Sequence, residues 1–130
     1  MNFRNWLWLE ELGYHGTRRN WTGKFDSSKL ATYEPANLGF FFTSEKDRAK
    51  HFLQKSSGYV HKTDIDIDNV IEIDAQGENL REFIPLIKKS KKKGKSGVVL
   101  NNVVDGILHK RLFVMFDADV IKTIDIEPIS

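Results

Sequence analysis

Leu12-Gly13-Tyr14-His15-Gly16-Thr17 is the stretch that decides the fold we expect for this chain. Tyr14 to Thr17 has the character of a strand that ends in a turn opened by glycine. A second stretch, Asn37-Leu38-Gly39-Phe40-Phe41-Phe42-Thr43-Ser44, predicts a strand over 39–42 that leads into a helix. We expect the two stretches to face each other across one pocket, held there by the remaining strands.

The composition is typical of one folded domain spanning residues 1–130, with 40% hydrophobic and 12% aromatic residues. The chain contains no cysteine, which excludes disulfides and thiolate sites. No apolar run approaches the roughly 20 residues that span a membrane, and charges interrupt the N-terminal segment too often for a signal peptide. We therefore expect a cytoplasmic protein outside the membrane, with secretion by a route without a signal peptide left open.

Charge is concentrated in one segment. The formal net charge is +2, and most of the imbalance comes from Lys88-Lys89-Ser90-Lys91-Lys92-Lys93-Gly94-Lys95. A net charge this small does not favour a dedicated nucleic-acid-binding protein. The lysine run could contact phosphates or an acidic partner, but a solvated helix end is the simpler interpretation.

Hydrophobic periodicity predicts few helices and many strands. Helices are predicted over 3–12, over the residues after an N-cap at Ser44 as far as 56–58, and over 78–89 with a kink or break at Pro85. Two strands are predicted within 59–73, and others over 96–100, 111–116 and 120–126, with loops over 18–35 and 101–110. Because no βαβ alternation is present, the pattern predicts an α+β fold.

Several motifs fail on spacing. Asp64-Ile65-Asp66-Ile67-Asp68 begins like a calcium loop, but Asn69 and Ala75 replace the required glycine and glutamate, so we interpret the acids as the solvated face of a strand. Gly94-Lys95-Ser96 lacks the earlier glycine of a phosphate-binding loop. His51, His61 and His109 have no metal-ligand spacing, and we expect solvated or capping roles for them. No metal site and no Gly-x-Ser-x-Gly elbow are therefore predicted.

Three features remain, in one order along the chain. The first is Tyr14-His15-Gly16-Thr17, and the second is Gly39-Phe40-Phe41-Phe42-Thr43-Ser44 with a following acid-started helix that carries Phe52. The third consists of the segments 96–106 and 113–122. Together they cover about two thirds of the chain and resemble the ADP-ribosyltransferase superfamily. The similarity is to its histidine-motif branch, which includes small domains of phage polyvalent proteins.

The resemblance implies a split, mostly antiparallel β-sheet arrangement with a few flanking helices. It also implies mono-ADP-ribosyl transfer, with NAD as co-substrate and nicotinamide as leaving group. The acceptor would be a macromolecule, most simply a protein, in a bacterium or an infected host cell, as for a toxin or effector. The resemblance implies no metal, and it leaves the oligomeric state open.

The same resemblance implies roles for individual residues. His15, helped by Thr17, would hydrogen-bond a ribose hydroxyl, and the Gly16 backbone would bind the nicotinamide carboxamide. Phe41 and Phe52 would stack on the two faces of the nicotinamide ring. The full set implied for NAD binding is Tyr14, His15, Gly16, Thr17, Phe41, Thr43 and Phe52.

Two departures from the family pattern affect catalysis. Phe41 stands where this branch often has tyrosine, and Leu112 stands where many members have a catalytic glutamate. An acid of the acceptor, or Asp105, could replace that glutamate. The departures favour an alternative, a non-catalytic module of the same fold that binds NAD, ADP-ribose or a protein.

RNA 2′-phosphotransferase-like chemistry is a further alternative. It uses a related fold and a His-Gly-Thr motif, and Arg18, Arg19 and the lysine run could meet phosphates. That chemistry expects further arginine and histidine motifs that we could not place in the chain.

Overall fold

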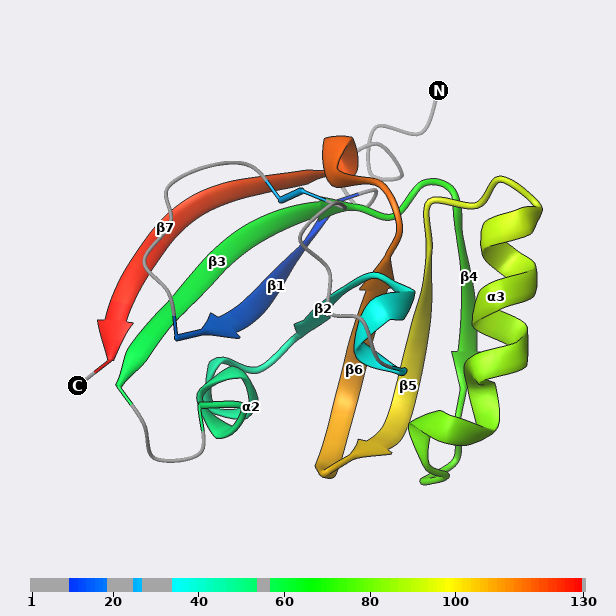
Figure 1. The fold of residues 1–130 in the computed structure, drawn as a ribbon, viewed down its shortest axis with the longest axis horizontal. Coiled ribbons are helices and arrows are strands. Elements are labelled where there is room, and N and C mark those ends of the chain that lie inside the picture. The colour runs from blue at the N-terminus through cyan, green and yellow to red at the C-terminus, as the bar shows by residue number, and fades with distance from the viewer. Residues whose placement is uncertain (1–9, 19–24, 27–33, 54–56, 130) are drawn as a thin grey trace.

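The computed structural model describes residues 10–18, 25–26, 34–53 and 57–129. Within them, seven strands form one sheet in the order β4-β5-β6-β2-β1-β3-β7 (Figure 1). The strands are β1 (Glu10–Thr17), β2 (Phe40–Thr43), β3 (Gly58–Asp66), β4 (Val70–Asp74), β5 (Gly97–Asp105), β6 (Ile107–Met115) and β7 (Ile121–Ile129). Only β4 and β5 pair in parallel, and all other pairs are antiparallel. The predicted α+β class is confirmed as a mostly antiparallel mixed sheet with few helices.

The helices described are α2 (Lys46–His51) and α3 (Ile84–Lys92), together with short 3-10 turns η2 (Ala36–Leu38), η3 (Leu80–Phe83) and η4 (Ala118–Val120). The predicted break near Pro85 is confirmed in position, because η3 gives way to α3 just before it. Pro85 lies in the first turn of α3, where a missing N–H costs no helical hydrogen bond. Figure 1 shows α3 running alongside β4 and β5.

The sheet is narrowest between β1 and β2. β1 is paired with β3 along its whole length, and β2 is paired with β6 along its whole length. Among the described residues, the backbones of β1 and β2 pair only at Tyr14 and Thr43. Figure 1 shows β1 and β2 lying at an angle to each other. The sheet therefore consists of two parts, one of β1, β3 and β7 and one of β2, β4, β5 and β6.

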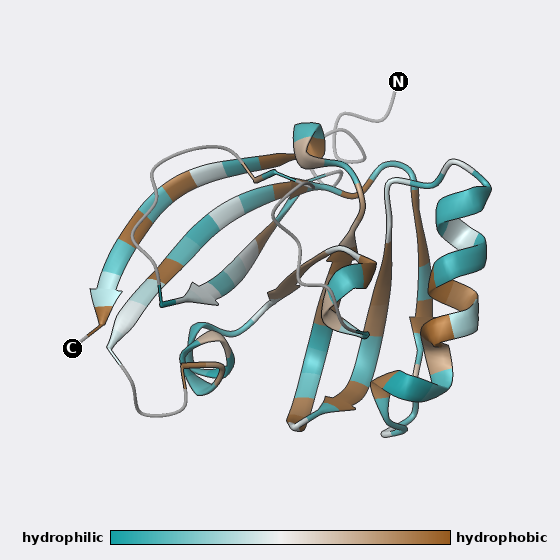
Figure 2. Cartoon of the chain, viewed as in Figure 1, coloured by the Kyte–Doolittle hydropathy of each residue, from teal (hydrophilic) through white to brown (hydrophobic). Residues whose placement is uncertain are grey.

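Each face of the sheet carries its own hydrophobic cluster. The first, which we call the helix face, includes the α3 residue Ile87 together with Leu80, Val98, Leu100, Val103, Leu112 and Val114. The second, the far face, includes Phe25, Phe40, Phe42, Ile65, Val99, Phe113 and Met115. Because both faces are covered, β5 and β6 are apolar over continuous stretches, as buried strands are. β3 and β7 instead show bands of alternating hydropathy (Figure 2).

The alternation along β5 reverses at Asn102. Leu100 and Val103 both belong to the helix-face cluster although three positions separate them. Asn102 lies between them with a φ of 56°, in the left-handed region. Beyond Asn102, the residues of β5 therefore face the opposite side of the sheet from the one that the earlier alternation predicts. β6 follows the same change, because Val103 pairs with His109. His109 is thereby fully buried.

Several local predictions were wrong. Glu10 to Leu12, predicted as the end of a helix, belong to β1, while residues 1–9 of that prediction lie outside the described residues. Most of the predicted 18–35 loop also lies outside them. Residues 101–110, predicted as a loop, are strand except for a tight turn at Gly106. The helix after β2 is capped at Glu45 rather than Ser44, and it ends at His51.

Candidate functional site

His15 links the two parts of the sheet. Its Nδ1 lies 2.8 Å from the backbone oxygen of Phe41. His15 directly follows Tyr14, the β1 residue whose backbone pairs with β2. A side chain thus makes the cross-strand hydrogen bond where the backbone ladder has ended. The first and second sequence motifs are consequently joined by a direct contact.

This contact defines the chemical state of His15. A carbonyl oxygen only accepts hydrogen bonds, so the Nδ1 atom must carry the proton. Burial lowers the pKa of His15, and the hydrogen bond to Phe41 opposes that shift only in part. The ring is therefore neutral at pH 7, which leaves Nε2 as a hydrogen-bond acceptor.

Aromatic rings surround His15 on the far face. Its ring centroid lies 5.3 Å from that of Phe25 in an edge-on arrangement and 5.5 Å from that of Phe42. The ring of His61, on β3, lies 6.3 Å away and is also edge-on. Such packing holds the imidazole in one orientation.

His61 corrects one prediction from the sequence. We expected a solvated or capping role, but His61 is fully buried. Burial, with a smaller contribution from the nearby His15, lowers the pKa of His61 to about 4. The spacing of His61 from Ile65 could have indicated this burial. His61, Thr63 and Ile65 alternate on one face of β3, and all three are buried.

Gly16 faces the opposite side of the sheet, as strand alternation requires of the residue after His15. A side chain at Gly16 would overlap the backbone oxygen of Ala49 in α2 and approach Leu53. The glycine therefore lets α2 lie directly on β1. Its predicted contact with a nicotinamide carboxamide stays a prediction. Tyr14 and Thr17, on either side, are partly buried.

A second polar group lies where α2 meets β2 and β6. The Nδ1 atom of His109 lies 3.1 Å from the hydroxyl of Thr43, and its Nε2 lies 3.3 Å from the backbone oxygen of Asp105. Because the carbonyl must accept, Nε2 carries the proton and Nδ1 accepts from Thr43. The ring of Phe52 stacks on His109 with 5.5 Å between centroids. His109 is thus a buried, doubly hydrogen-bonded residue and not the solvated or capping one we expected.

The remaining predicted site residues lie on or near the helix face. The side chain of Phe41 packs against the helix-face cluster, and Leu112 is fully buried inside it. The position aligned with the usual glutamate is therefore part of the hydrocarbon core. Asp105 lies at the end of β5, and burial raises the pKa of its carboxyl group. The structure thus groups Thr43, Phe52 and Asp105 around His109, while the stacking of nicotinamide between Phe41 and Phe52 stays a prediction.

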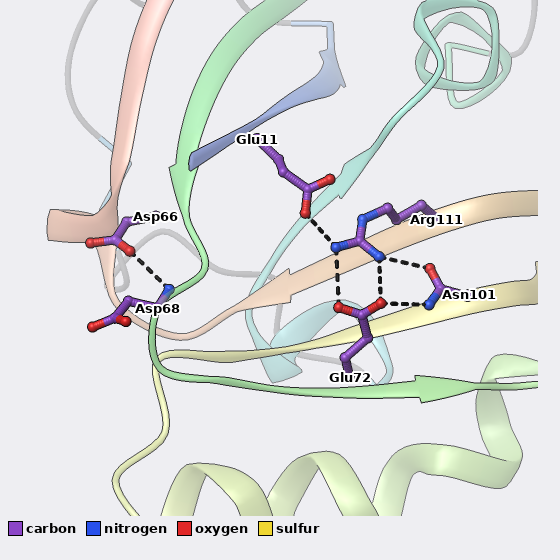
Figure 3. Close-up of polar contacts among 6 residues, drawn as sticks. All are labelled: Glu11, Asp66, Asp68, Glu72, Asn101 and Arg111. Atoms are coloured by element: carbon purple, nitrogen blue, oxygen red, sulfur yellow. Dashed lines mark hydrogen bonds and ion pairs between the residues drawn. The ribbon is translucent and has the colours of Figure 1, made fainter. Parts of the chain in front are cut away.

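A charged cluster around Arg111 was not predicted. Its guanidinium donates to Glu72 at 2.8 and 3.2 Å, to Asn101 at 2.9 Å, and to Glu11 (Figure 3). It also lies over the ring of Phe113, 5.4 Å from the centroid. Hydrogen bonds from Arg111 and Asn101 hold the pKa of Glu72 below its usual value. The cluster joins β1 to β4, β5 and β6. Predicting it would have required the order and pairing of these strands.

The acids between β3 and β4 have a local role. The carboxylate of Asp66 accepts a hydrogen bond of 2.9 Å from the backbone N–H of Asp68 and so closes the turn (Figure 3). Across the described ranges, no group of three or more His, Asp or Glu side chains is arranged to hold a metal ion.

An open hollow of about 380 Å³ lies beyond the end of β1. It is lined by Arg18, Ser57, Gly58, Tyr59, Pro128 and Ile129. One of its lining residues, Arg18, directly follows Thr17. Neither His15 nor His109 lines the hollow.

No protein-family model matches the chain, and no curated protein matches it. In the part of the chain that the structure describes, no helix is long and apolar enough to cross a membrane.

Proposed function

We propose that this protein is a mono-ADP-ribosyltransferase with an ADP-ribosyltransferase-like split sheet, and that it moves ADP-ribose from NAD to a protein acceptor. The contact between His15 and the Phe41 carbonyl carries the proposal, because it brings together two motifs that lie 26 residues apart. The narrow β1–β2 junction supports it as well. The order of the three sequence motifs supplies the remaining support. We place this activity in the cytoplasm of a bacterium or an infected cell.

His15 would act on the ribose of NAD. Its Nε2 is an acceptor, so it would accept a hydrogen bond from a ribose hydroxyl and fix the sugar in one position. The bond between ribose C1′ and the nicotinamide nitrogen then breaks, and neutral nicotinamide leaves with the bonding electrons. A nucleophile of the acceptor forms the new bond to C1′ and loses its proton. Positioning of the sugar and electrostatic stabilisation supply most of the rate.

His15→Phe tests this role. The phenyl ring keeps the packing against Phe25 and Phe42, but it has neither nitrogen. We expect nicotinamide release and transfer of label from NAD to lysate proteins to fall at least about 100-fold, as for a lost positioning group. His51→Ala, a change at an exposed histidine, serves as the matched control and should keep the activity. Circular dichroism and the melting temperature check that both variants are folded.

A non-catalytic NAD-binding module is the second candidate, and Leu112 favours it. Leu112 is fully buried, so the place of the usual glutamate offers neither a carboxylate nor an approach for one. Calorimetry that shows NAD binding in the wild type, weakened by His15→Phe, without nicotinamide release would select this candidate. A folded wild-type protein that neither binds nor consumes NAD would contradict both.

A further inference from the structure

The C-terminal end of α3 carries a cluster of lysines that we call the lysine patch: Lys88, Lys89, Lys91, Lys92, Lys93 and Lys95. The first five are exposed, and Lys95 is partly exposed. The formal charge of the whole chain is +2, so without these six lysines it would be 2 − 6, or −4. Positive charge is thus concentrated at one end of one helix. Figure 2 shows this end of α3 as hydrophilic.

The patch is built on ordered backbone. α3 ends in a Schellman motif, in which Gly94 has a φ of 82°, its N–H bonds to Lys91, and the N–H of Lys95 bonds to Ser90. The side chain of Asn69 also donates to the Gly94 carbonyl at 3.1 Å. The lysines are therefore presented from a fixed helix end and the turn that follows it.

Few of these charges are neutralised. Lys88 forms an ion pair with Glu34. Among the ion pairs between described residues, none involves the other five lysines. Their charges are therefore available to an external anion.

Helix stability does not account for six lysines. One or two cations in the last turn interact favourably with the helix dipole. Lys88 and Lys92, and also Lys89 and Lys93, stand four residues apart, where like charges repel and destabilise a helix. A local conflict of this kind in a folded protein is expected at a functional site.

The surroundings of the patch identify its partner. In α3, Ile84 and Ile87 pack against the sheet and Leu86 is partly buried, so the helix has no broad apolar face left to enter a membrane. The run has no aromatic residue to anchor a protein interface or to stack on unpaired bases. Lysines alone match a dense row of phosphates, such as the backbone of a nucleic-acid duplex.

We propose that the lysine patch binds the phosphate backbone of double-stranded nucleic acid, without preference for sequence. The α3 helix rises about 1.5 Å per residue, so Lys88 and Lys92 are about 6 Å apart along the axis. Duplex DNA carries one phosphate for about every 1.7 Å of its own axis, so several lysines can each meet a phosphate at once. This site is independent of the proposed NAD chemistry.

Fluorescence anisotropy with labelled duplexes of about 20 base pairs and unrelated sequence tests the proposal. Binding should weaken steeply between about 50 and about 200 mM salt, with log K falling by about 0.9 per log unit of salt for each phosphate contacted. Lys92→Gln/Lys93→Gln should weaken binding at least about fivefold and reduce that slope by about 2. Lys89→Gln/Lys91→Gln should do the same.

Lys110→Gln/Lys122→Gln is the matched control, since it removes the same charge from exposed lysines on β6 and β7. It should keep both the affinity and the slope. An equal loss in this control would overturn the proposal, as would absence of duplex binding at about 50 mM salt. Binding to phosphatidylserine vesicles or to polyglutamate in place of duplexes would overturn it in favour of a membrane or an acidic protein.

Discussion

At the scale of single residues, three histidines lie at contacts between strands: His15 against Phe41, His61 beside His15, and His109 against Thr43. The neighbourhood of His15 and Phe41 was predictable, because the order of the motifs requires their strands to lie close together. The face of the sheet on which each residue lies was not predicted. His15 and Gly16 are neighbours in β1, so the side chain of His15 lies on the far face, whereas Gly16 faces α2 on the other side of the sheet. The burial of His61 and His109 depends on partners far away in the chain.

Three histidines, the partly buried His15 and the fully buried His61 and His109, make the stability depend on pH. Burial lowers the pKa of His15, His61 and His109 relative to the unfolded chain. Unfolding therefore takes up protons below about pH 6.5, and the free energy of unfolding falls as the pH falls. For His61 the fall in stability spans the pH range from 6.5 down to about 4. Asp105 opposes this trend, because its pKa is raised.

Urea denaturation at pH values from about 7.5 to about 4.5 measures this dependence. We expect the free energy of unfolding to be constant above about pH 7 and to fall below about pH 6.5. His61→Phe keeps a ring beside Phe25 and should make the fall shallower. A free energy of unfolding that is flat across the range, or that rises as the pH falls, would contradict the burial described for these residues.

At the scale of elements, strands with regular alternation were predictable and irregular ones were not. The alternation around Ile65 predicted β3, and the apolar run Val98-Val99-Leu100 predicted part of β5. Residues 101–110 escaped prediction because the reversal at Asn102 places Leu100 and Val103 on the same face, which breaks the period of two. β1 was missed at its start because Glu10-Glu11-Leu12 has no strand signature of its own, and its pairing with Asp64 to Asp66 supplies the order.

Asn102 can be tested by two substitutions. Its φ of 56° is tolerated by asparagine and favoured by glycine. Asn102→Gly should change the free energy of unfolding by less than about 0.5 kcal/mol, whereas Asn102→Ala should lower it by about 1 kcal/mol. Urea denaturation of both variants measures the difference. Equal stabilities for the two variants would argue against a left-handed residue at this position.

At the scale of the whole molecule, Arg111 connects β1 to the strands β4, β5 and β6 of the sheet. It bonds Glu11 in one part and Glu72 and Asn101 in the other, and little backbone pairing joins these parts at β1 and β2. The split arrangement that the resemblance implies stays a prediction, and the connection through Arg111 was not predicted at all. Its four residues are spread from position 11 to position 111, and only the complete strand order brings them together.

Replacing Arg111 should therefore weaken the whole sheet. Arg111→Leu leaves two carboxylates close together without their cation, and we expect a loss of about 2 kcal/mol or more in the free energy of unfolding. Arg111→Lys should recover only part of that loss, because lysine lacks the forked geometry that reaches several acceptors. Arg81→Leu, at an exposed arginine, is the control and should cost less than about 0.5 kcal/mol. A loss for Arg111→Leu as small as that of the control would show that the cluster contributes little.

The strand order also has a consequence for a chain in which β7 has not yet formed. The part made of β2, β4, β5 and β6 is complete in sequence once Met115 has been synthesised. The other part contains β1 and β3 by then, but the outer edge of β3 has no partner until β7 follows, from Ile121 to Ile129. Until β7 pairs with it, β3 therefore exposes an open strand edge, which is the kind of edge that recruits foreign strands. Pairing with β7 covers that edge of β3 and makes β7 the outer strand of the sheet.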